Sequence, residues 1–249
     1  MTSTPRSSDP QPILSGPKRT NSDANNSTCY DPEDMITIVV RDDNKTKDYK
    51  MFRKLLMWRY SYFAGALDPS SGFISEQEKS ITLEYSHQLF DAFYCWFYTG
   101  GLKDPVKNAT EKTQVYLDLA LVRKIWVFAD CHGIPELGNS ATDMLHECLV
   151  ATWNTHSTCI KYIHNNTVAS SMLRSFVVDW SSSTHSFKSL DFPDKENQQT
   201  VQYLHDVMLK IAERNGQRRL SREEAMAMNR CQWHDHSGPG GKLRLESRK

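Results

Sequence analysis

The stretch from Phe90 to Leu102 constrains the fold of this chain more than any other segment. Its aromatic residues recur at the helical spacing i, i+3, i+4 and i+7 and therefore share one face of a helix. They are Phe90, Phe93, Tyr94 and Phe97. Thr99, Gly100 and Gly101 follow directly, and glycine at this place permits the left-handed backbone that ends a helix. The sequence therefore predicts a helix over residues 86–98 that buries an aromatic face in a core.

The bulk composition excludes several classes of protein. Thirty basic and 30 acidic residues among 249 leave no net charge, so no global field attracts nucleic acid or an anionic membrane. No uncharged apolar run approaches the roughly 18 residues of a membrane-spanning helix. The six cysteines form no tight pairs, and no signal segment precedes them. We expect a soluble, reduced, intracellular protein with no nucleic-acid or membrane partner, and nucleus and cytoplasm both remain open.

The two ends of the chain differ in composition from its middle. Residues 1–33 are rich in Ser, Thr, Asn and Pro and bury too little apolar surface to offset the entropy of ordering. The stretch from residue 211 to the end contains nine Lys and Arg but only five Asp and Glu. It also includes a run of glycine and proline at 238–241. We expect a disordered arm over 1–33 and a basic flexible tail over 217–249.

The first half of the middle alternates between strand and helix signals. β-Branched residues predict a strand over 35–40, and a polar turn leads to a second strand over 47–52. Helical spacing follows to residue 67, then a short strand over 80–83 and the aromatic helix.

The second half shows helical periodicity throughout. A long helix is expected to end near residue 133, and Pro135 suits the first turn of the next helix. Further helical faces follow at 160–163 and 169–180. The last amphipathic helix is expected to bury a face made of Val201, Leu204, Met208 and Ile211.

The order of these segments resembles one known family. The residues that carry the resemblance are Asp34 before the β-branched run, Phe52 to Leu56, Tyr62, Phe63, Gly72, Phe73, Ile81 to Leu83, Phe90, Trp96, Tyr98 to Gly100, Leu102 and the later stretch Ala129 to Leu137. In this order and spacing they look like a BTB/POZ domain over residues 34–149, with a motif core at 34–102. The helices at 150–216 resemble the C-terminal extension of BTB proteins common in filamentous fungi.

The resemblance implies a fold and a function. The fold is α+β, with helices clustered around a small sheet and an all-helical extension after it. The function is protein–protein interaction, usually with homodimerisation, and neither catalysis nor a small-molecule substrate is implied.

The resemblance also points to a charged pocket. In several relatives, an acidic residue before the first strand faces a basic residue at the start of the first helix near the dimer interface, and here these positions carry Asp34 and Arg53. The alternative is that Asp34 only turns the chain into the strand. The family pattern also departs at Phe52, where His is frequent, and at Tyr60 and Ser61, where Ser-Pro is common.

A second partner that the family suggests is a cullin scaffold of a ubiquitin ligase. Adaptors of this kind carry a hydrophobic-x-Glu motif in the loop before the third strand. Ile74, Ser75 and Glu76 fit the motif, whereas the register expected from the family selects Phe73, Ile74 and Ser75, which lacks the glutamate. The role of substrate adaptor is therefore an alternative.

A cluster of potential metal ligands lies near the C-terminus. Cys231, His234 and His236 lie within six residues, a spacing that can begin a zinc site. A fourth ligand is not evident, so a mobile polar tail without metal or cofactor is the primary expectation. A small metal-binding protein is the alternative from a different class.

Other signals favour structure over catalysis. A glycine-rich phosphate loop, a nucleophile elbow and a His-Glu-x-x-His element are all absent from the sequence. His132 stands at a helix end, where we expect it to interact with terminal carbonyls. The aromatic face at 90–97 contains no Lys or Arg, unlike a base-stacking surface. The sequence predicts a protein that is not an enzyme.

Overall fold

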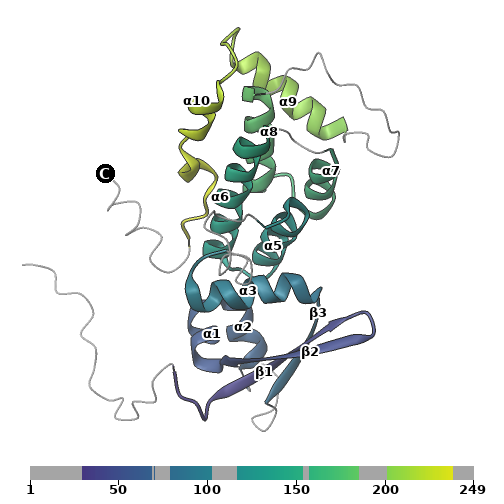
Figure 1. Cartoon of the computed structure of the whole chain (residues 1–249), viewed down its shortest axis with the longest axis vertical. Coiled ribbons are helices and arrows are strands. Elements are labelled where there is room, and N and C mark those ends of the chain that lie inside the picture. The colour runs from purple at the N-terminus through teal and green to yellow at the C-terminus, as the bar shows by residue number, and fades with distance from the viewer. Residues whose placement is uncertain are drawn as a thin grey trace, which may run out of the picture.

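A computed structural model describes residues 30–68, 70, 79–102, 117–153, 157–184 and 201–237. The chain is a mixed α+β protein with a small sheet at one end and helices stacked beyond it (Figure 1). None of the helices in these ranges is long and apolar enough to cross a bilayer.

The sheet has three strands in the order β2-β1-β3. Strands β1 (Met35–Asp42) and β2 (Lys45–Phe52) are antiparallel and joined by a tight turn in which Asp43 has a φ of 51°. Strand β3 (Ser80–Glu84) runs parallel to β1. The central strand places Ile36, Ile38 and Val40 on its buried face, since alternate residues of a strand point to the same side.

Three helices cover the sheet end. They are α1 (Arg53–Arg59), α2 (Ser61–Leu67) and α3 (His87–Thr99). The hydroxyl of Ser86 accepts a hydrogen bond from the backbone N–H of Leu89 at the start of α3, and Gly100 ends it with a φ of 73°. Phe90 and Phe93 are completely buried. The predicted aromatic helix with its glycine stop is therefore confirmed.

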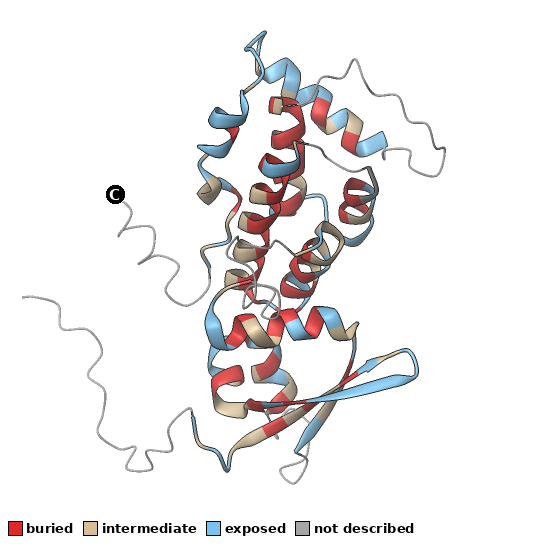
Figure 2. Ribbon diagram, viewed as in Figure 1, coloured by how far each residue is buried: buried red, intermediate tan, exposed pale blue. Residues whose placement is uncertain are grey.

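The rest of the described chain is helical. Its elements are α5 (Leu119–Cys131), α6 (Pro135–Thr152), α7 (Ser157–Asn166), α8 (Met172–Thr184), α9 (Val201–Glu213), α10 (Arg222–Met226) and the 3₁₀ turn η4 (Arg230–Trp233). Helices α6 and α8 carry long buried surfaces, as Figure 2 shows.

The two halves share one hydrophobic core. Phe128 of α5 lies 5.2 Å from Phe93 of α3, measured between ring centroids. The same cluster of buried side chains continues through Leu145 of α6 and Trp180 of α8. The expected domain boundary after residue 149 falls inside α6, within this continuous core.

The predicted buried face of α9 is wrong at Val201, Met208 and Ile211, which are exposed, whereas Leu204 is partly buried. Helix α9 buries Tyr203 and Val207, while Val201 and Met208 are 84% and 70% exposed. Tyr203 donates a hydrogen bond to the hydroxyl of Ser181 on α8, at 2.7 Å between the oxygens. This polar contact and the packing of Tyr203 fix the rotation of α9, and helical spacing of apolar residues alone does not contain that information.

The expected flexible tail over 217–249 is also wrong for much of its described part. Helix α10 begins with a capping box formed by Ser221 and Glu224. Trp233 is only 2% exposed, lies edge-on to Phe176 at 5.0 Å and donates its indole N–H to Asp179. These long-range contacts anchor the segment despite its polar composition.

Candidate functional site

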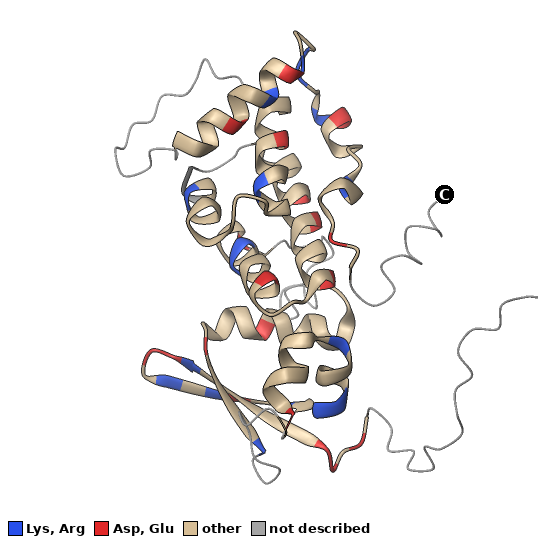
Figure 3. Cartoon of the chain, turned by 180° about the vertical axis from the view of Figure 1, so that it is seen from behind, with Lys and Arg blue, Asp and Glu red and all other residues tan. Residues whose placement is uncertain are grey.

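The structure brings the predicted charged pair together at the start of the sheet. Because Met35 pairs with Phe52 in the β1–β2 register, Asp34 and Arg53 become neighbours, and the backbone N–H of Arg53 donates to the carbonyl of Asp34. The Arg53 guanidinium lies 3.8 Å from the Asp34 carboxylate, and the Lys54 ammonium lies 3.6 Å from it. Figure 3 shows acidic residues before β1 and basic residues on α1.

The charged pair is shielded but not deeply buried. The side chain of Arg53 is 14% exposed and that of Asp34 is 28% exposed. Such a pair lies between an exposed one, which contributes less than about 1 kcal/mol, and a buried one, whose loss costs about 3–5 kcal/mol. Lys54, which the family resemblance did not assign to the pocket, adds a second cation to the same carboxylate. The signal in the sequence for this second cation is that Lys54 directly follows Arg53.

A row of aromatic side chains passes through Phe52, the residue directly before Arg53. Tyr30 meets Phe52 edge-on at 5.5 Å, and Phe52 meets Tyr98 at 6.4 Å. Tyr30 is 62% exposed and Tyr98 is 41% exposed, so this row lies at the surface. Aromatic residues and arginine are the types enriched in the centres of protein interfaces. We call Tyr30, Asp34, Phe52, Arg53 and Tyr98 the N-terminal surface.

The other departures from the family pattern have different surroundings. Tyr60 is 1% exposed and packs among Phe63, Trp96 and Phe97 in the core. Burial is the main cause that raises its pKa. This residue therefore shapes the packing of α1 and α2 and is not itself available to a partner. The candidate cullin-binding residues Phe73, Ile74 and Glu76 lie outside the described residues.

A second site lies where the C-terminal segment, residues 217–237, crosses α6. The thiol of Cys231 and one ring nitrogen from each of His234 and His236 lie within 4.8 Å of one another. The Nε2 atom of His234 also lies 3.0 Å from the Asp143 carboxylate. The structure thus places the three weak metal candidates side by side on an ordered segment.

Hydrogen bonds and ion pairs fix this segment on α6. The backbone N–H of Asp235 donates to the side-chain oxygen of Asn139, whose amide nitrogen donates to the Asp235 carbonyl, both at 2.8 Å. Arg230 pairs with Asp143 at 3.2 Å and with Glu147 at 3.0 Å. Sequence reasoning missed Asn139 and Asp143, which lie 96 and 91 residues from their partners and carry no local signal.

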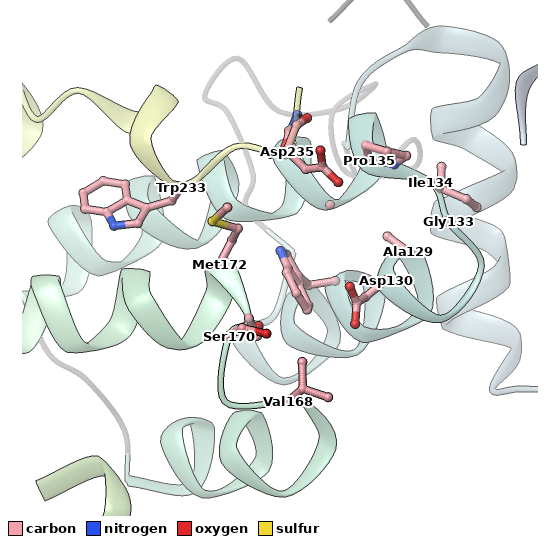
Figure 4. Close-up of a pocket in the computed structure, with 14 residues that line it drawn as sticks. Ala129, Asp130, Gly133, Ile134, Pro135, Val168, Ser170, Met172, Trp233 and Asp235 are labelled. Atoms are coloured by element: carbon pink, nitrogen blue, oxygen red, sulfur yellow. Dashed lines mark hydrogen bonds between the residues drawn. The ribbon is translucent and has the colours of Figure 1, made fainter. Parts of the chain in front are cut away.

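A pocket of about 230 Å³ opens beside the same segment, lined by the α5–α6 junction, residues 168–172 and the C-terminal segment. Figure 4 shows Asp235 and Pro135 on one side and Val168 and Ser170 on the other. Burial, and secondly the negative charge of Asp235, raise the pKa of Asp130 in this pocket. The lining thus combines two carboxyl groups, those of Asp130 and Asp235, with apolar surface at Trp126 and Met172.

His132 lies at the helix end where it was expected, and its neighbours are a backbone carbonyl and aromatic rings of the core. Its Nδ1 atom is 2.7 Å from the carbonyl of Phe128, and its ring stacks on the Phe128 ring at 4.2 Å. It is 3% exposed, and burial lowers its pKa. A neutral imidazole in this aromatic surrounding contributes to packing of the core.

Comparison with known proteins adds no assignment, since no family model matches the chain and no curated protein is similar to it.

Proposed function

We propose that this chain is a protein–protein interaction module of the BTB/POZ type that binds a second copy of itself through the N-terminal surface. The observation that carries the proposal is the partly exposed aromatic row beside the shielded pair Asp34–Arg53. The strand order of the sheet, with β1 between an antiparallel β2 and a parallel β3, supports the BTB/POZ interpretation of the sequence.

The chemistry of the surface suits recognition by binding. Tyr30 and Tyr98 offer large, rigid apolar area with polar tips, and their burial against a second chain removes both from water. Desolvation on association strengthens the attraction between Asp34 and Arg53, because the local dielectric constant falls. The surface therefore favours a partner that covers Asp34 and Arg53 without separating the two charges.

Sedimentation equilibrium of the full chain at tens of micromolar tests self-association. A dimer is expected, and a strict monomer rules the proposal out. In the variant Asp34→Asn/Arg53→Gln, we expect weaker association with far-UV circular dichroism unchanged. Tyr30→Ser should weaken association without touching either charge.

The ion pair Arg41–Glu84 supplies a matched control. It lies toward the other end of β1, with 3.9 Å between the charged groups, and both side chains are mostly exposed. Arg41→Gln/Glu84→Gln should leave the dimer constant unchanged. If both double variants weaken association equally, the effect is not specific to the pair Asp34–Arg53, and the N-terminal surface is not the interface.

A further inference from the structure

We propose that Cys231, His234 and His236 form a zinc-binding site on the C-terminal segment, next to Asp143 of α6. The proposal is independent of self-association. It begins with the mutual proximity of the three potential ligand atoms, which all lie within 4.8 Å of one another.

The local backbone explains why the two histidines lie on the same side. His234 has an extended conformation with φ −93° and ψ 139°, and alternate side chains of an extended segment point the same way. Trp233 and Asp235 line the pocket shown in Figure 4, whereas His234 and His236 belong to the ligand cluster. The 3₁₀ turn of η4 places Cys231 next to them.

The contacts of the two imidazoles fit metal binding. A carboxylate only accepts, so Nε2 of His234 carries the proton that it shares with Asp143, which leaves Nδ1 as the ligating nitrogen. A carboxylate that orients a ligating histidine in this way is the usual outer contact of zinc sites. Nε2 of His236 is buried and has no hydrogen-bond partner within the described part of the chain.

The donor set selects the metal. One thiolate and two imidazoles suit Zn²⁺, which accepts sulfur and nitrogen ligands in tetrahedral geometry, and they suit Mg²⁺ or Ca²⁺ poorly. Ligand atoms of a tetrahedral zinc site are about 3.3–3.8 Å apart, so the distances between the ligand atoms need to shorten by at most about 1.5 Å to close the cluster around the ion. Three protein ligands leave the fourth position to water or another small donor.

The experiment uses the purified full chain, stripped with a chelator and dialysed against Zn²⁺. Metal analysis should give one equivalent of zinc, and Co²⁺ in its place should show a thiolate-to-cobalt charge-transfer band. Cys231→Ser should lose the band, while Cys131→Ser, with an exposed thiol on α5, keeps it. Zinc content near background, or a band that persists in Cys231→Ser, overturns the proposal.

Two further variants, each with a matched control, keep the test decisive if Cys231→Ser fails to fold. His236→Gln should lower zinc affinity at least tenfold, and His205→Gln, an exposed histidine of α9, should not change it. Asp143→Asn should weaken zinc binding by about 10–100-fold, the usual effect of removing an orienting carboxylate. Glu147→Gln also removes a contact to Arg230 but does not touch His234, so equal losses in the two variants contradict the assigned role of Asp143.

Discussion

The sheet end and the C-terminal segment are held to the core by different forces. At the sheet end, Phe93 lies among Phe63, Phe90 and Phe128 with ring centroids 5.2–6.3 Å apart. The C-terminal segment adds Trp233 and Ala225 to the core, with Leu220 and Met228 packed against it, and forms hydrogen bonds and ion pairs to α6. Salt screens charged contacts but does not screen apolar packing. One core therefore contains two regions that should respond differently to mutation, pH and ionic strength.

The largest effect is expected from removing an aromatic ring at the sheet end. Phe93→Ala should lower the free energy of unfolding by about 3–5 kcal/mol, because the substitution leaves a cavity that close-packed neighbours fill only partly. Urea titration followed by far-UV circular dichroism measures the loss. Cys95→Ala, on the partly exposed side of the same helix, should cost much less, and a similar cost would contradict the core assignment.

A smaller effect is expected at the junction between α5 and α6, which connects the two regions. Gly133 has a φ of 59°, and a Cβ there would lie 2.9 Å from the hydroxyl oxygen of Ser61. Left-handed backbone costs a residue with a Cβ about 1–2 kcal/mol, so Gly133→Ala should destabilise by at least that amount.

Two controls separate backbone strain from the clash. Ser61→Ala removes the oxygen, so the double variant with Gly133→Ala should recover only the steric part of the loss. Gly65 lies inside α2 with open space around its Cβ position among the described residues, and Gly65→Ala should be neutral or stabilising. If Gly133→Ala is equally harmless, the junction tolerates a side chain and our account of it is wrong.

The sequence predicted the sheet end better than the C-terminal segment for a physical reason. Ser86, the aromatic spacing and Gly100 all act within one helix, so local pattern is enough to place α3. Trp233, by contrast, is anchored by Asp179 and Phe176, more than 50 residues away, and its neighbours are polar. The same limit explains α9, where the contact between Tyr203 and Ser181 decides which side is buried.

The candidate sites follow the same rule. Asp34 and Arg53 were paired through the family resemblance, and the hairpin register accounts for their contact. The cluster of Cys231, His234 and His236 was visible as spacing, but its supports Asn139 and Asp143 lie on α6. Sequence patterns therefore supplied the ligand types, whereas the ordering of the segment depends on tertiary contacts.

Acid should destabilise the protein through buried histidines outside the C-terminal segment. Burial is the main cause that lowers the pKa of His132 at the end of α5 and of His164 in α7. The folded state then binds fewer protons than the unfolded chain, whose histidine pKa is about 6.5. Stability is complete above that pH and falls as the pH drops through it toward the folded pKa, by up to about 1.4 kcal/mol for each unit of difference.

Urea titrations at a series of pH values between 7.5 and 5 measure this loss. His132→Phe keeps an aromatic ring beside Phe128 and removes the titrating group, so it should flatten the profile in part. His205→Gln, at an exposed position, should leave the profile unchanged. A profile in His132→Phe identical to that of the parent chain would assign the acid sensitivity to other groups.

The smallest effect is expected at Arg230, and it separates the two regions most directly. Arg230→Met keeps most of the side-chain length and removes the ion pairs with Asp143 and Glu147. Because its side chain is 34% exposed, the loss should be about 0.2–1 kcal/mol at low salt and should shrink in high salt as screening weakens the pairs in the parent chain. The cost of Phe93→Ala should stay constant over the same salt series. Equal salt dependence in the two variants, measured by urea titration with zinc chelated, would mean that packing rather than charge anchors Arg230 on α6.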